Sequence, residues 1–166
     1  MTDLARFWRH ILMHPARARR AFPAAAMEAI GREIAAQEQS HRGEIVFIAE
    51  AELNSAQLWR GLTPRSRAKE VFALHGVWNT EENNGVLIYV LLADRAVEIV
   101  ADRAIDARVT AEEWTRICRA MQDEFAAGRY ADGAIGGVRS ASQLLAKHFP
   151  ASGPHRNDLP DRPVLI

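Results

Sequence analysis

The sequence lacks the features that would assign it at once to a specialised class. It contains one cysteine, Cys118, so it can form neither an internal disulfide nor a site built from several thiolates, which fits a reducing compartment. Its 21 basic residues balance 21 acidic ones, without the positive excess of a dedicated nucleic-acid-binding protein. The longest apolar run, residues 86–93, is far shorter than the roughly 20 residues that cross a bilayer. We therefore expect neither nucleic-acid binding nor a transmembrane segment.

What is present is enough for one folded domain. The chain has 166 residues, 48% of them hydrophobic, which can bury a single sizeable core. Residues 1–21 are a basic amphipathic segment, and residues 22–149 carry the regular hydrophobic patterns of the domain. Residues 150–166 contain four prolines and are expected to form an extended tail.

Hydrophobic periodicity predicts the order helix, strand, helix, hairpin, helix, helix. The two strands of the hairpin are so close in sequence that they must pair antiparallel. Thr110 and Glu113 have the spacing of a capping box, which marks the start of a helix. The expected helices lie between residues 23 and 40, 64 and 75, 111 and 127, and 132 and 148, and the expected strands cover residues 44–54, 85–92 and 96–101.

The N-terminal segment allows two interpretations. Its first 22 residues hold five arginines against one acidic residue, with aromatic and aliphatic residues at helical spacing. It is either a terminal helix that packs its aromatic residues on the domain, or an interfacial helix that contacts anionic lipid or a membrane protein through Arg6, Phe7, Trp8 and Arg9. Because its apolar stretch is too short for an export signal, we expect a cytoplasmic protein, peripheral to the inner membrane in the second interpretation.

Several ordered motifs resemble one family. Asn-Gly-Val-Leu-Ile at 84–88 follows Trp78, Asp-Arg stands at 94–95, and Val-Glu-Ile at 97–99; Phe125, Gly-Arg-Tyr at 128–130 and Gly133 come later. Over about residues 24–148 the chain is similar to the TPM domain, which is named after a thylakoid lumen phosphatase-like protein, a photosystem repair protein and a modulator of acetylcholine receptors. The resemblance implies a Rossmann-like three-layer α/β/α sandwich with a small mixed sheet that includes one antiparallel hairpin, in the short soluble bacterial type.

The resemblance also implies divalent-metal binding and weak acid phosphatase activity, but the motifs depart from the family pattern. Asp-Asn-Gly is Asn83-Asn84-Gly85 here, so a carboxylate has become an amide. Gly-Tyr-Gly-Leu-Glu is replaced by residues 102–106, in which Asp106 keeps the acid and Asp102 is new. The family pattern also has an acidic residue directly after a threonine, but here Thr110 is followed by Ala111. Two family carboxylates are therefore displaced.

Hairpin geometry predicts which polar residues share one edge of the sheet. Asn83, Asn84, Asp102 and Asp106 could supply oxygen ligands to Ca²⁺ or Mg²⁺. Arg103, and the helix that starts at Thr110, could contact a phosphate or another anion. The structural alternative is that these residues simply satisfy strand ends and a helix entry.

Two functions stay open. The first is a binding or assembly module with a divalent-metal or anion site at this edge, docked to an unidentified protein, a membrane protein or a lipid surface. The alternative is a weak metal-assisted phosphatase acting on phosphomonoesters, with Asp102 and Asp106 as metal ligands and Arg103 as phosphate clamp. The displaced carboxylates favour the first. His10 and His14, four residues apart, are expected to pack or lie at the surface, and Cys118 to be a buried structural thiol.

Overall fold

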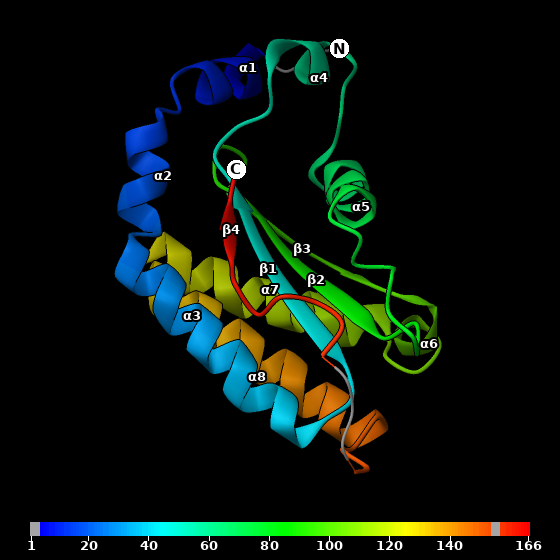
Figure 1. The fold of residues 1–166 in the computed structure, drawn as a ribbon. Coiled ribbons are helices and arrows are strands. Elements are labelled where there is room, and N and C mark those ends of the chain that lie inside the picture. Colours follow the sequence, from blue (N-terminus) through cyan, green and yellow to red (C-terminus); the bar gives the residue numbers. More distant parts are fainter. Residues whose placement is uncertain (1–3, 154–156) are drawn as a thin grey trace.

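A four-stranded mixed sheet forms the centre of the fold (Figure 1), with the strand order β3-β2-β1-β4. The computed structural model describes residues 4–153 and 157–166. Strand β1 (Glu44–Glu50) pairs in parallel with β2 (Gly85–Leu91), and β2 pairs antiparallel with β3 (Ala96–Ala101). The short strand β4 (Val164–Leu165) adds to the free side of β1 in parallel.

The helices around this sheet are numbered in their order along the chain. They are α1 (Leu4–Ile11), α2 (Pro15–Ala21), α3 (Ala24–Gln37), α4 (Ser55–Trp59), α5 (Pro64–Leu74), α6 (Arg103–Asp106), α7 (Ala111–Ala126) and α8 (Tyr130–His148), with a 3₁₀ turn η1 (Glu38–Ser40) after α3. Helices α3, α7 and α8 cover one face of the sheet, and α5 lies on the other (Figure 1). The predicted three-layer α/β/α sandwich is confirmed.

The central strands are buried on both sides, which explains their unbroken apolar sequence. Alternate residues of β1 and β2 enter two separate cores. Phe47 and Ile88 contribute to the core under α3, α7 and α8, whereas Ile48 and Tyr89 contribute to the core under α5. Within β1 and β2, both faces are therefore occupied by core packing.

The observed boundaries differ from the predicted ones in three places. Strand β1 ends at Glu50 because Asn54 forms a capping box with Gln57 and starts α4. The N-terminal segment is two helices, α1 and α2, with α2 beginning at Pro15, a residue favoured at a first helical turn. The C-terminal tail returns along β1 and contributes β4, where the Ile166 amide donates to the Ala49 carbonyl (2.8 Å). No helix in the described part of the chain has the length and hydrophobicity to span a bilayer.

Candidate functional site

Four of the predicted site residues lie at the end of the sheet where β1 and β2 begin. Val86 pairs with Ala101, so the segments just beyond this pair lie side by side. The Asp102 amide donates to the Gly85 carbonyl (2.8 Å), and the Ala104 amide donates to the Asn83 carbonyl (3.2 Å). Backbone pairing thus brings the two loops together. We call Asn83, Asn84, Asp102 and Arg103 the amino-edge site.

Arg103 links these two loops. Its Nη2 donates to Asn83 Oδ1 (2.7 Å), and its Nε lies 3.8 Å from Asp102 Oδ1. Asn83 adopts a left-handed backbone (φ 52°), which asparagine tolerates better than most residues. The Arg103 side chain is nevertheless 85% exposed, so an anion from solution can reach its guanidinium group.

Two buried oxygen atoms in this site have no hydrogen-bond donor among the described residues. Asp102 caps α6 by accepting from the Arg103 amide at Oδ1 (2.7 Å), while its Oδ2 is buried and unpaired. The Asn84 Nδ2 donates to the Arg42 carbonyl, while the Asn84 Oδ1 is likewise buried and unpaired. A buried acceptor without a hydrogen-bond donor destabilises the folded protein by about 1–3 kcal/mol. A hydrogen-bond donor or a cation next to either oxygen would remove this cost.

The other two predicted residues, Asp106 and Thr110, have different surroundings. Asp106 is exposed and lines a groove along the outer edge of β3, together with Arg65 and Trp114. Thr110 forms the predicted capping box: its Oγ1 accepts from the Glu113 amide (3.3 Å), and its own amide donates to Glu113 Oε2 (2.9 Å). These bonds hold the pKa of Glu113 below its ordinary value. The N-terminus of α7 therefore already has a carboxylate next to it.

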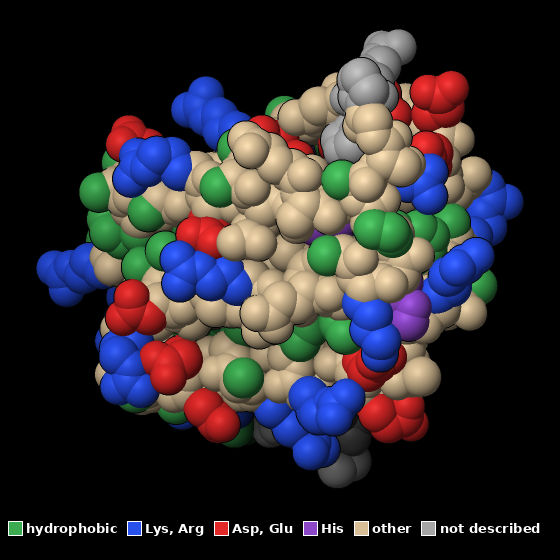
Figure 2. Space-filling model, turned by 90° about the horizontal axis from the view of Figure 1, so that it is seen from below, with side chains coloured by type: hydrophobic (Ala, Val, Ile, Leu, Met, Phe, Trp, Pro, Cys, Tyr) green, Lys and Arg blue, Asp and Glu red, His purple; other side chains and the backbone are tan. Residues whose placement is uncertain are grey.

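The amino edge does not concentrate negative charge. Within residues 4–153 and 157–166, no cluster of three or more His, Cys, Asp or Glu side chains is placed to hold a metal ion. Figure 2 views the molecule from this end, and acidic and basic side chains are interspersed around the face. A cation here would depend on amide and backbone oxygens as well as on Asp102.

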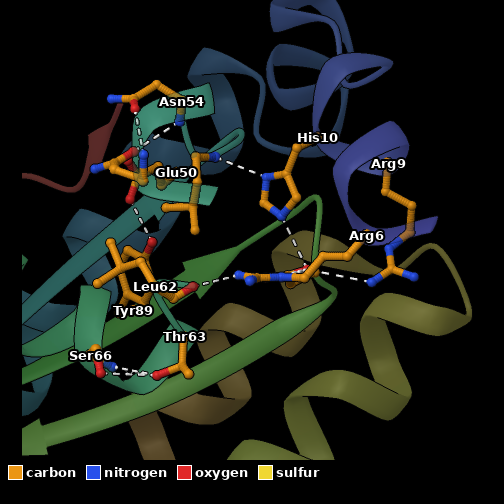
Figure 3. A network of polar contacts seen from close by, with 12 residues as sticks. Arg6, Arg9, His10, Glu50, Asn54, Leu62, Thr63, Ser66 and Tyr89 are labelled. Atoms are coloured by element: carbon orange, nitrogen blue, oxygen red, sulfur yellow. Dashed lines mark hydrogen bonds and ion pairs between the residues drawn. The ribbon is translucent and has the colours of Figure 1, made fainter. Parts of the chain in front are cut away.

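The opposite end of the sheet holds a polar cluster that the sequence analysis missed (Figure 3). Glu50, at the end of β1, accepts hydrogen bonds from Arg67 (Nε to Oε2 and Nη2 to Oε1, both 2.9 Å, and Nε to Oε1, 3.3 Å) and from the Tyr89 hydroxyl. Burial and the bond to the Glu50 carboxylate raise the pKa of Tyr89 above its ordinary value. Because these charges are paired, the cluster ties α5 to β1 and β2. An acidic residue at the end of an apolar run was the available signal.

Asp94, in the β2–β3 turn, binds side chains of α1 at this end of the sheet, and Figure 3 shows Arg6 and His10 reaching from α1 toward the same point. Arg6 donates to both carboxylate oxygens of Asp94 (2.7–3.1 Å), and His10 Nε2 lies 3.1 Å from Asp94 Oδ1. His10 Nδ1 accepts from the Leu53 amide (2.9 Å), which fixes the tautomer that carries its proton on Nε2. Burial would raise the pKa of Asp94, but the hydrogen bonds from His10 and Arg6 and the positive charge of Arg6 outweigh it and hold that pKa well below its ordinary value.

The predicted contact residues of α1 divide between the protein and the solvent. Arg6 points inward, and Phe7 packs edge-on against Trp59 of α4 (ring centroids 6.5 Å apart). Trp8 is 52% exposed, and Arg9 lies 3.5 Å from Asp94 with about half of its side chain exposed. Packing on the domain therefore accounts for only part of the segment.

The remaining candidate residues have structural roles. His10 is fully buried in the Asp94 cluster, whereas His14 caps α2 by accepting from the Ala16 amide (3.2 Å). The two rings thus serve different elements. Burial raises the pKa of the Cys118 thiol to about 11, so the reactive thiolate is scarce at neutral pH.

Comparison with known proteins agrees with this architecture. The solved structures that resemble the chain include the following two. The NMR structure of the BA42 protein from the psychrophilic bacterium Bizionia argentinensis is 29% identical, with a TM-score of 0.72 over 87% of this chain and 94% of that one. The N-terminal domain of a protein from P. gingivalis is 21% identical, with a TM-score of 0.62 over 80% of this chain and 82% of that one, and it supports the fold alone.

Among curated proteins, none matches the chain significantly. The family model described as the TPM domain matches residues 19–144, which include the whole sheet apart from β4, helices α3 to α7 and most of α8. The chain therefore belongs to the TPM domain family.

Proposed function

We propose that this TPM domain is a binding module whose amino-edge site takes a divalent cation, Ca²⁺ or Mg²⁺. One observation carries the proposal: Asp102 Oδ2 and Asn84 Oδ1 are buried oxygen acceptors without a donor in the described chain. Both ions prefer carboxylate, amide and carbonyl oxygens, so these two atoms are of the kind that they bind. Water or solvent cations would otherwise have to satisfy these atoms.

The composition of the site predicts weak binding. Asp102 is its single carboxylate, whereas high-affinity calcium sites use several, and affinity falls with the charge of the ligand set. We therefore expect a dissociation constant on the order of 0.1–1 mM. Such a cation would stabilise the contact between the loop at residues 79–84 and α6.

A partner would complete the site from outside. Arg103 stands next to Asp102 with its guanidinium group exposed, and such a group can bind a carboxylate or phosphate through two hydrogen bonds. An acidic group on a partner protein can thus contact Arg103 and the cation together. This arrangement supports cation-dependent assembly.

Weak hydrolysis of phosphomonoesters is the second candidate. The accessible Arg103 favours it, because a phosphate clamp must reach solvent. It ranks second because Asp106, the second carboxylate that this mechanism requires, lines the groove outside β3. The chain's own contribution would be limited to orienting the phosphate at Arg103.

Thermal unfolding of chelator-treated protein tests the proposal. At ten times the dissociation constant, a bound cation stabilises the protein by about 1.4 kcal/mol, which raises Tm by roughly 3–5 °C in a domain of this size. We expect Ca²⁺ or Mg²⁺ to raise the Tm of the wild type and of Asp106→Asn by this amount. The Tm of Asp102→Asn should not rise. Asparagine is also a good helix cap, so Asp102→Asn should still fold.

Two results would contradict the proposal: no rise in the wild type, or an equal rise in Asp102→Asn. Hydrolysis of p-nitrophenyl phosphate in the same samples separates the two candidates. Metal-dependent turnover that disappears in Asp102→Asn would favour the phosphatase, and saturable metal binding without turnover would favour the binding module.

A further inference from the structure

Helix α1 is attached to the protein by its polar side. Arg6 and His10 point toward Asp94, and both are largely or completely buried. At 100° per residue they lie about 200–240° around the helix from Leu4. A surface helix normally buries its apolar side instead. The orientation of α1 is therefore the reverse of the usual one.

The apolar side of α1 faces outward as a consequence. Leu4, Trp8 and Ile11 recur at the i, i+4, i+7 spacing of one helix face, and the Leu12 amide continues the helical bonding to the Trp8 carbonyl (2.9 Å). Trp59 of α4 extends this side through its edge-on contact with Phe7. We call the outward side chains the apolar face: Leu4 (69% exposed), Trp8 (52%), Ile11 (52%), Leu12 (67%) and Trp59 (74%).

Within the described chain, exposed large hydrophobic side chains are concentrated at the apolar face. Its other large hydrophobic side chains with high exposure are Leu74 at the end of α5, Trp78 in the turn that follows α5, and Ile166 after β4. Contiguous exposed apolar side chains usually mark a site of interaction, whereas single ones need no explanation. We therefore expect the apolar face to contact a binding partner.

Positive charge accompanies the apolar face. Arg9 and Arg60 adjoin Trp8 and Trp59 in sequence, and both have exposed side chains. Helix α2, which follows directly, adds the exposed residues Arg17, Arg19 and Arg20. The sequence contains no acidic residue between Leu4 and Met27. The occupant should therefore be apolar in its interior and negatively charged at its surface.

We propose that the apolar face binds the surface of an anionic lipid bilayer. Aliphatic and tryptophan side chains enter the boundary between headgroups and acyl chains, and arginines attract anionic headgroups. Asp94 keeps α1 fixed in the orientation that presents this face, so the chain would reach the membrane with the helix already formed. In Figure 1, α1 lies beyond the carboxyl end of β1 and β2, so a bilayer bound by the apolar face would lie on the side opposite the end where these strands begin.

Co-sedimentation of the full chain with vesicles tests this, in EDTA so that the result is independent of the proposed cation site. We expect binding to vesicles containing phosphatidylglycerol, weaker binding at high salt and little binding to pure phosphatidylcholine. Trp8→Ser and Leu12→Ser should each weaken binding at least tenfold, since each removes a large side chain from the lipid boundary. Trp78→Ser, at an equally exposed tryptophan outside the apolar face, should bind like the wild type.

Substitution of single arginines tests whether positive charge contributes to vesicle binding. Arg17→Gln and Arg20→Gln should each weaken binding about fivefold, whereas Arg32→Gln, an exposed arginine on α3, should not. Equal binding to neutral and anionic vesicles, or no binding, would overturn the proposal. So would self-association of the protein that Trp8→Ser abolishes, because the face would then serve a second copy of the chain.

Discussion

Replacing Asp94 with alanine should release α1 from the sheet, and its contacts set the size of the effect. The substitution removes the acceptor for Arg6, whose side chain is 18% exposed, and takes away the carboxylate that lies 3.1 Å from the fully buried Nε2 of His10. Breaking a buried ion pair on one side typically costs 3–5 kcal/mol. Because Arg6 retains its bond to the Leu62 carbonyl (2.8 Å) and some contact with water, we expect about 3 kcal/mol.

Urea unfolding at neutral pH measures this loss. Glu33→Ala is a matched control, since it removes a carboxylate from an ion pair with Arg139, whose side chain is 58% exposed, and should cost less than about 1 kcal/mol. The double variant Arg6→Ala/Asp94→Ala should lose less than the sum of the two single variants, because their effects are coupled. A loss in Asp94→Ala no larger than in Glu33→Ala would refute the proposed anchoring of α1.

Acid should act on the same contact. The pKa of Asp94 is lower in the folded protein than its ordinary value of 3.8, so the unfolded chain takes up the proton first as pH falls. The stabilisation is complete above the unfolded value and is lost as pH decreases through the folded one. Asp94→Asn should therefore remove the steepest part of the acid unfolding curve below about pH 4.

Two further changes have expected outcomes. Burial raises the pKa of Glu38 to about 8, so the folded protein keeps a proton that the unfolded chain loses above its ordinary value of 4.5. As pH rises between these values, the free energy of unfolding should fall by up to about 1.4 kcal/mol per pH unit. Urea unfolding measured at several pH values should show a smaller dependence on pH in Glu38→Gln than in the wild type. A Cβ on Gly85 would collide with the Val77 carbonyl, so Gly85→Ala should lose more than about 3 kcal/mol in thermal melts. Gly136→Ala, in open space on α8, should gain about 0.5–1 kcal/mol in the same melts.

The sequence predicted the fold well because its strongest signals are local. Continuous apolar runs specified β1 and β2, the short spacing specified the β2–β3 hairpin, and Thr110 with Glu113 marked the start of α7. Each of these features depends on residues only a few positions apart. Asn54 carries the same kind of signal, since it caps α4, but the apolar run before it predicts the end of a strand there.

The site was harder to predict because long-range contacts decide it. Hairpin pairing correctly placed Asn84 and Asp102 at one end of the sheet, but α6 then turns Asp106 toward the groove outside β3. His10 and Asp94 are far apart in sequence, so neither the burial of His10 nor the reversed orientation of α1 could be derived from periodicity. Helical spacing identifies a polar and an apolar side without showing which of them contacts the protein.

Amide NMR of the chelator-treated protein titrated with Ca²⁺, and separately with Mg²⁺, tests the proposed cation site most directly. We expect saturable shifts at residues 83–85 and 102–104 that disappear in Asp102→Asn and persist in Asp106→Asn. No shift at about 10 mM cation, or shifts that survive in Asp102→Asn, would contradict cation binding by the buried oxygens of Asn84 and Asp102.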